Sequence, residues 1–230
     1  MGILKGGLLG PFRKKTGAVV GRQRKGQNVM TGLHRISQKP PSESQLEERL
    51  KFGLLNNFLS NIVPLVNPGF KRYAKVGSAL NAAYSYNVEH AFVKQGEDWH
   101  INFPKMVYSR GHIDTPEGAE AVLVPGEEEV GDAGILFSWL LQKQTASCQF
   151  TDMASFLVYN ASKNKAMIVS AAVNRYALSY LFRLPQDFGG DTVHCYMSFA
   201  SADGKQTGDS VYLRELPFYV PPQQVPQQAP

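Results

Sequence analysis

Hydrophobic side chains recur every four residues between residues 42 and 64, and they form the clearest periodic pattern in the chain. The repeat consists of Leu46, Leu50, Leu54, Phe58 and Ile62. This spacing places the side chains on one face of an α-helix. Ser44 with Glu47 three positions later is a capping-box pattern, and Pro64 is expected to end the helix. We predict an amphipathic helix here and a second helix over residues 75–92.

From residue 99 onward, short β-prone runs alternate with turn-forming residues. The predicted strands are residues 101–108, 119–124, 135–141, 155–159, 166–173, 177–184, 192–200 and 210–213. Such spacing favours an antiparallel sandwich over βαβ units. The predicted fold is therefore mainly β with an N-terminal helical segment. An immunoglobulin- or fibronectin-like sandwich fits these signals, and so does a jelly roll, which differs in strand order.

The first 41 residues form a glycine-rich arm of different composition. Its segment "GAVVGRQRKGQNVM" contains two β-prone runs, residues 18–20 and 27–30, around Lys25-Gly26. Glycine at such a turn favours a β-hairpin. An isolated hairpin is marginally stable in water, so this one needs a surface to pack on. The body of the chain, a neighbouring copy or nucleic acid could provide that surface.

The net charge of +5 conceals an uneven distribution. Residues 1–41 carry nine Lys and Arg and no acidic residue, whereas the remainder carries a net charge of −4. The candidate contact residues are Arg13, Lys14, Lys15, Arg22, Arg24 and Lys25. They suit either sequence-independent contacts with nucleic-acid phosphates or docking on the acidic body of another copy.

Composition also predicts the organisation of the chain. We expect a basic arm at residues 1–41, a helical segment at 42–98, a β-sandwich at 99–216 and a Pro/Gln-rich tail at 217–230. We expect no membrane span, because every apolar run is shorter than the roughly 18 to 20 residues required. The N-terminus lacks the apolar block of a signal peptide, so we expect a cytoplasmic or virion location rather than secretion.

Residues capable of catalysis or metal binding do not form a recognisable set. The histidines are His34, His90, His100, His112 and His194, and none lies in a catalytic motif. Cys148 and Cys195 lie in apolar runs and are predicted to be buried free thiols. His112 with Asp114 provides too few ligands for a metal, and residues 127–129 are expected to form a solvated acidic loop. We expect no cofactor, no metal and no small-molecule substrate. Trp139 is expected in the sandwich core.

Several motifs resemble those of a known group of proteins. They are "GGLLGPFRKKTGAVVGRQRKGQNVM", "PPSESQLEERLKFGLLNNFL", "NPGFKR", "NAAYSYN" and "DTVHCYMSFASADGKQTGDSVYL". Together they resemble an uncharacterised domain family of Bacteroidota and their phages, with an arm of the form GxxGxxGxVVGxxxKG, a Gln-Leu helix and a β-rich half. Arg22-Gln23-Arg24 replaces the small residues and Trp expected before Lys25-Gly26. The resemblance supports the layout and implies no activity.

These observations predict a non-enzymatic structural protein that assembles with copies of itself. The most concrete form is a capsid-type component of a phage or virus-like virion, whose basic arm contacts neighbouring subunits or packaged nucleic acid. This step is an analogy at the level of the fold. The alternative is a cytoplasmic immunoglobulin-like module that binds a protein partner.

Overall fold

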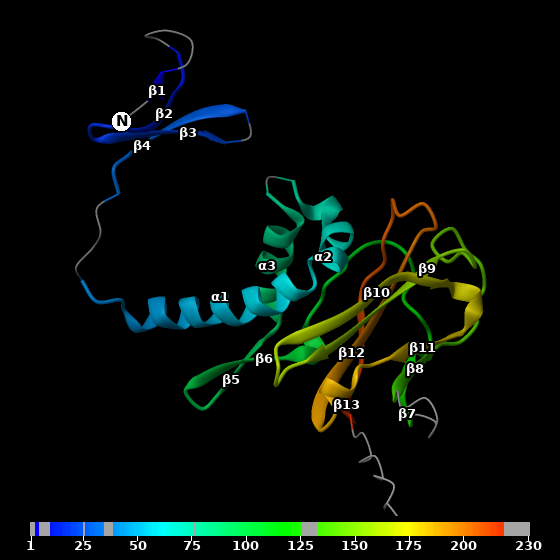
Figure 1. The fold of residues 1–230 in the computed structure, drawn as a ribbon. Helices are drawn as coiled ribbons and strands as arrows, with labels where there is room; N and C mark the ends of the chain where they lie inside the picture. The colour runs from blue at the N-terminus through cyan, green and yellow to red at the C-terminus, as the bar shows by residue number, and fades with distance from the viewer. Residues whose placement is uncertain are drawn as a thin grey trace, which may run out of the picture. The chain divides into compact units, whose positions relative to one another are not determined.

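A computed structural model describes most of the 230-residue chain (Figure 1). The described residues are 3–4, 10–24, 26–34, 39–75, 77–125 and 133–218. The chain forms two compact units, Met1–Ser42 and Glu43–Pro230. The first is the arm and the second is called the body below.

The arm is a four-stranded antiparallel sheet with strand order β1-β2-β3-β4. Its strands are β1 (Ile3–Leu4), β2 (Phe12–Thr16), β3 (Val19–Arg24) and β4 (Gln27–Gly32). The predicted hairpin is confirmed as β3–β4, in which Arg24 pairs with Gln27. Gly26 has a φ of +79°, a conformation that glycine adopts at little cost. Two further strands extend the hairpin into a sheet that the sequence did not predict.

The body begins with three α-helices rather than one or two. They are α1 (Glu43–Asn61), α2 (Val63–Gly69) and α3 (Ala79–His90), with the 3-10 turn η1 (Lys71–Tyr73) between the last two. The capping-box prediction is wrong, because α1 begins before Ser44. Pro64 lies in the first turn of α2, where a missing N–H is tolerated. Ser78 caps α3 by accepting a hydrogen bond from the backbone N–H of Asn81 at 3.2 Å.

Seven strands of the body form a two-sheet sandwich. They are β7 (Glu120–Val124), β8 (Gly134–Ser138), β9 (Met153–Asn160), β10 (Lys165–Asn174), β11 (Ser179–Arg183), β12 (Asp191–Ala200) and β13 (Val211–Phe218). One sheet has the order β11-β8-β7 and the other β10-β9-β12-β13, and every pair within them is antiparallel. If the strands are lettered A, B, C, C′, E, F and G in chain order, the sheets are A-B-E and C′-C-F-G. This order fits the immunoglobulin- or fibronectin-like prediction.

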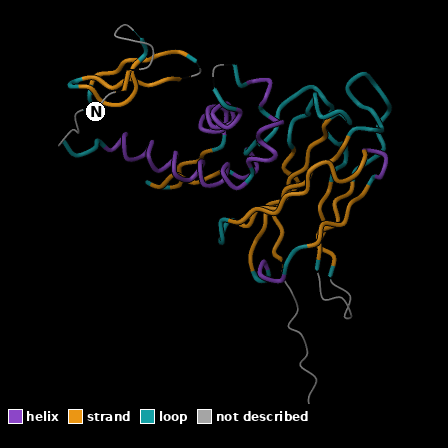
Figure 2. Tube along the Cα trace, turned by 45° about the horizontal axis from the view of Figure 1, so that its top comes forward, coloured by secondary structure: helices purple, strands orange, loops and turns teal. Residues whose placement is uncertain are grey.

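The helices add a third layer to the sandwich (Figure 2). Along β9 and β12, one set of alternate side chains, including Phe156 and Val193, lies in the core between the two sheets. The other set, including Leu157 and Tyr196, lies in a second core with α1 and α2. The two central strands of the larger sheet are therefore buried on both faces.

The predicted strand at residues 101–108 is wrong. The chain instead forms a hairpin of β5 (Phe92–Gln95) and β6 (Asp98–Ile101), followed by the 3-10 turn η2 (Phe103–Lys105). Pro104 within η2 has no N–H for a sheet ladder. The backbone N–H of Val107 donates instead to the side chain of Asn87 in α3 at 2.8 Å, so this segment is bonded to a helix rather than to a strand.

Candidate functional site

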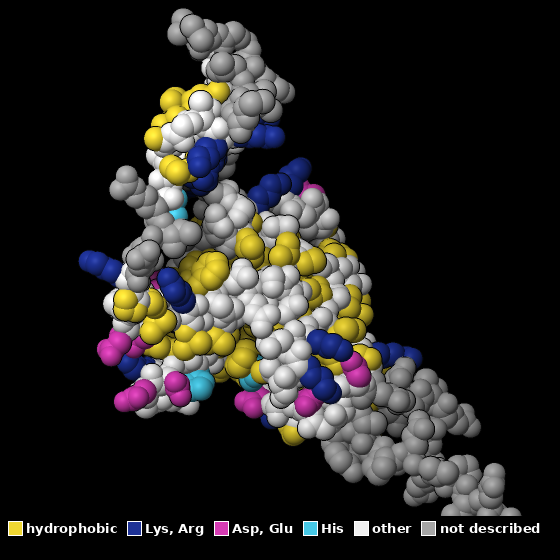
Figure 3. All heavy atoms as spheres, turned by 60° about the vertical axis from the view of Figure 1, so that its left-hand side comes forward, with side chains coloured by type: hydrophobic (Ala, Val, Ile, Leu, Met, Phe, Trp, Pro, Cys, Tyr) yellow, Lys and Arg dark blue, Asp and Glu magenta, His cyan; other side chains and the backbone are white. Residues whose placement is uncertain are grey.

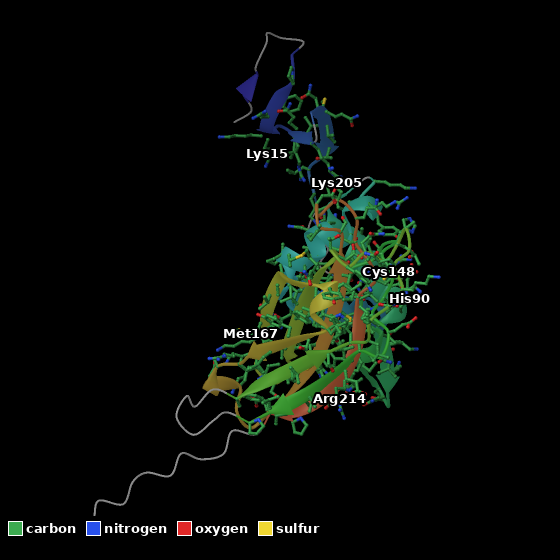
Figure 4. All side chains as sticks on the ribbon, turned by 90° about the vertical axis from the view of Figure 1, so that its right-hand side faces the viewer. Lys15, His90, Cys148, Met167, Lys205 and Arg214 are labelled. Atoms are coloured by element: carbon green, nitrogen blue, oxygen red, sulfur yellow. The ribbon has the colours of Figure 1, made fainter. Side chains whose placement is uncertain are left out.

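The structure distributes the predicted contact residues over both faces of the arm. Lys15 pairs with Val20, and Arg22 and Arg24 follow at alternate positions of β3, so these three basic side chains share one face. Figure 4 labels Lys15 in the arm. Arg13 donates a hydrogen bond to the side chain of Gln23, which belongs to the opposite face.

The backbone at Lys14 departs from a regular strand. Lys14 lies opposite Gly21 and has a φ of +72°, which interrupts the alternation of side chains along β2. Lys25 lies outside the described residues. The structure therefore brings Lys15, Arg22 and Arg24 together and leaves Arg13 and Lys14 apart from them.

The described part of the arm sheet has almost no buried interior. Among its described residues only Gly21 is buried, and Phe12, Val19, Val20 and Val29 are half-buried. Met30 is 66% exposed, which is far above the exposure of a core methionine. The described residues of the arm therefore expose hydrophobic and basic side chains together and form no packed core.

His194 and Cys195 lie in different environments, as their positions in β12 dictate. His194 stacks on Phe103 with ring centroids 3.9 Å apart, and its Nδ1 lies 3.3 Å from the Tyr212 hydroxyl. Burial lowers the pKa of His194, while Glu215 opposes this shift. Cys195 lies in the core between the sheets, where burial raises the pKa of its thiol to about 12. The two side chains lie on opposite faces of the strand, and this arrangement does not make a nucleophile–base pair.

The remaining predictions concern the two cysteines, metal binding, the acidic segment at residues 127–129 and membrane spans. Cys148 and Cys195 are buried and free, as predicted. Within the described ranges, no three His, Cys, Asp or Glu residues are grouped as a metal site would require. The acidic residues 127–129 lie outside the described part of the chain. The helices that the structure describes include none long and apolar enough to cross a membrane.

A fully buried arginine stabilises one end of the sandwich. The Nε of Arg175 lies 3.4 Å from a carboxylate oxygen of Asp152. Its guanidinium also donates to the backbone oxygen of Asp114 at 2.8 Å and stacks 3.8 Å from the Phe199 ring centroid. Trp139 is buried in the core, as predicted, and donates to the backbone oxygen of Arg175 at 2.8 Å. These contacts are internal, so we assign the cluster a structural role.

A second group of basic residues lines a hollow of about 500 Å³ in the body. The group comprises Lys71, Arg72, Arg110, His112 and Lys205. Sequence reasoning missed it because the five residues come from three distant segments, and no local spacing connects them. Only the folded chain brings these charges together.

The fold and its basic surfaces define a class: a β-sandwich protein with a helical layer on one face and a basic β-sheet arm. The sequence profile of DUF6266, a family of unknown function, matches residues 11–214, from the residue before β2 of the arm into the last strand, β13. The chain belongs to this family, and membership of an uncharacterised domain family is thereby confirmed. A comparison with curated proteins found no match.

Proposed function

We propose that this protein is a non-enzymatic structural protein whose arm binds a neighbouring copy during assembly. The observation that supports the proposal is the sheet of the arm, in which Gly21 is the one buried residue among those described. A small sheet is stable in water when it has a hydrophobic face of its own to bury or packs on another element. A partner surface that covers Val19 and Met30, which share the face of the sheet opposite Lys15, Arg22 and Arg24, would supply the missing packing.

Charge complementarity favours a second copy as that partner. The arm has nine basic residues and no acidic one, while the rest of the chain is net negative. Opposite potentials attract the two surfaces and orient them. Each copy provides one arm and one acidic body, so such contacts can continue from copy to copy into a closed or open assembly.

We propose a phage or virus-like virion as the most concrete setting, with copies located in the cytoplasm before assembly and in the virion afterwards. The assignment to Bacteroidota and their phages rests on motif resemblance and is part of this proposal. In the same setting, the face carrying Lys15, Arg22 and Arg24 suits contact with packaged nucleic acid, because such contacts need only phosphate-neutralising charge.

The oligomeric state of the purified full chain tests the proposal. We expect rings, tubes or shells by electron microscopy and a mass of many copies by size-exclusion chromatography with light scattering. Nuclease treatment shows whether nucleic acid holds the copies together. A stable monomer over the accessible concentration range would contradict self-assembly and favour the alternative, a protein-binding module.

A charge-reversal pair tests the part played by the arm. The arm variant replaces Arg13, Lys14, Lys15, Arg22 and Arg24 by Glu, and the control replaces the exposed body residues Arg49, Lys105, Lys143, Arg183 and Arg214 by Glu. Both variants change the charge equally. We expect the arm variant to raise the concentration needed for assembly at least tenfold and the control to assemble like the wild type. Equal loss in both variants would show an effect of net charge alone.

A further inference from the structure

The basic hollow in the body is built from three segments that are far apart in sequence. Lys71 and Arg72 belong to η1, Arg110 and His112 to the segment before β7, and Lys205 to the turn between β12 and β13. Figure 4 labels Lys205 at this turn. Among the described residues that line the hollow, none is acidic.

Backbone hydrogen bonds fix the walls of the hollow. The N–H of Arg110 donates to Gly69 at 3.0 Å, and the N–H of His112 donates to Thr207 at 2.8 Å. A Cβ at Gly111 would lie 1.6 Å from the Thr207 backbone oxygen, so only glycine permits this close approach. The three segments are therefore held together before any ligand arrives, which lowers the entropic cost of binding.

Three of the four Lys and Arg side chains of the hollow have no ion-pair partner within the described part of the chain. Lys71, Arg72 and Arg110 form no ion pair there. The guanidinium of Arg110 is held instead by aromatic rings, 4.2 Å from the centroid of Tyr86 and 4.8 Å from that of Tyr73. Lys205 pairs with Asp203 at 3.1 Å, and both side chains are exposed. Like charges gathered in one hollow repel each other, and a multiply charged anion would relieve that repulsion.

We propose that this hollow binds a phosphate-bearing ligand. Guanidinium groups suit bidentate contacts with phosphate oxygens, and Lys71 and Lys205 add point charges. The volume of about 500 Å³ lies within the usual range for small-molecule sites. The N–H groups of Gly111 and His112 are already bonded to Asp209 and Thr207, so the side chains are the donors that face a ligand. Because these N–H groups are not free to bond the carbonyl oxygens of a peptide, the arrangement fits phosphate better than an acidic peptide.

The ligand can be the phosphate chain of a nucleotide or the backbone of a single-stranded nucleic acid, since both present the same groups. The inference does not rest on the proposed assembly, because every residue involved lies in the body. The test uses the full chain with all nine Lys and Arg of residues 1–41 replaced by Gln, so that the arm contributes no positive charge to binding.

Titration calorimetry with inorganic triphosphate, ATP and an eight-nucleotide oligo(dT) distinguishes the sources. We expect saturable binding of at least one probe at one site per chain, weakened at least tenfold between 50 and 300 mM NaCl. The variant Lys71→Gln/Arg72→Gln should weaken it at least tenfold further. Its matched control, Lys105→Gln/Lys143→Gln, removes two exposed lysines elsewhere and should bind like the parent.

Triphosphate and ATP binding alike would identify the phosphate chain of a small molecule, and binding of the oligonucleotide alone would identify a nucleic-acid backbone. Three results would overturn the proposal: no saturable binding of any probe, equal loss in the two double variants, or tighter binding of oligoglutamate than of every phosphate probe. Lys71 and Arg72 are exposed, so we expect their replacement to leave the fold intact, and circular dichroism of each variant checks this.

Discussion

His194 shows how the position of a single residue sets its chemistry. It lies between Phe103 and Tyr212 at the contact of the larger sheet with the segment after β6, and it is 6% exposed. Water cannot solvate an imidazolium there, so the neutral form is favoured in the folded protein. Tyr159 lies on the same face, and burial raises its pKa to about 12, so the tyrosine stays neutral as well.

The lowered pKa of His194 predicts a loss of stability in mild acid. The unfolded imidazole binds a proton below its ordinary pKa of 6.5, while the folded one resists it. The free energy of unfolding therefore falls as the pH drops below about 6.5, by up to about 1.4 kcal/mol per pH unit. Urea unfolding at pH 7.5, 6.5 and 5.5 measures this slope. We expect His194→Gln to flatten it and the exposed control His100→Gln to retain it; equal slopes in all three proteins would contradict the assignment.

At the scale of elements, α1 uses its hydrophobic stripe in two different ways. Leu55, Phe58 and Leu59 in its second half are buried, whereas Leu46 and Leu50 in its first half are 51% and 46% exposed. Figure 3, which brings forward the side of the molecule where α1 begins, shows hydrophobic side chains at the surface among charged ones. The periodicity predicted the stripe correctly, but it did not show which half is covered within one copy.

Two alanine variants of α1 test this division. Phe58 packs against Tyr159 with ring centroids 4.6 Å apart, and Phe58→Ala should lower the free energy of unfolding by about 3–5 kcal/mol. Leu50→Ala lies on the same stripe, and we expect it to cost about 0.5 kcal/mol or less. Chemical denaturation of both variants measures the difference. Similar losses would mean that the first half of α1 is also covered in solution.

At the scale of the whole molecule, the body has two hydrophobic cores of its own, whereas the described residues of the arm form none. The cores lie between the two sheets and between the larger sheet and the helices. Deletion of residues 1–42 should therefore leave a cooperatively folded body. We expect its unfolding midpoint to change by no more than about 4 °C, which corresponds to about 1 kcal/mol for a domain of this size.

Thermal unfolding by circular dichroism, at concentrations where the full chain is dissociated, measures this change without the stabilisation that assembly adds. A body that loses cooperative unfolding on deletion would show instead that the arm is an integral part of its fold. The full chain in the same buffer is the reference.

The sequence by itself determined those features that depend on near neighbours. The four-residue repeat of α1, the β3–β4 hairpin, the strand succession from β7 to β13 and the uneven charge all follow from local composition and periodicity. The predicted strand at residues 101–108 failed because Val107 donates its backbone N–H to Asn87 of α3, 20 positions earlier, instead of to a neighbouring strand.

Only the tertiary structure decided how these elements combine. β9 and β12 are buried on both faces. Their sequences therefore lack a clear alternation of buried and exposed residues, which would have shown which face the helices cover. The strand order and the basic hollow depend on contacts between residues up to about a hundred positions apart. Such contacts are set by packing and backbone hydrogen bonds in the folded chain, and no spacing in the sequence encodes them.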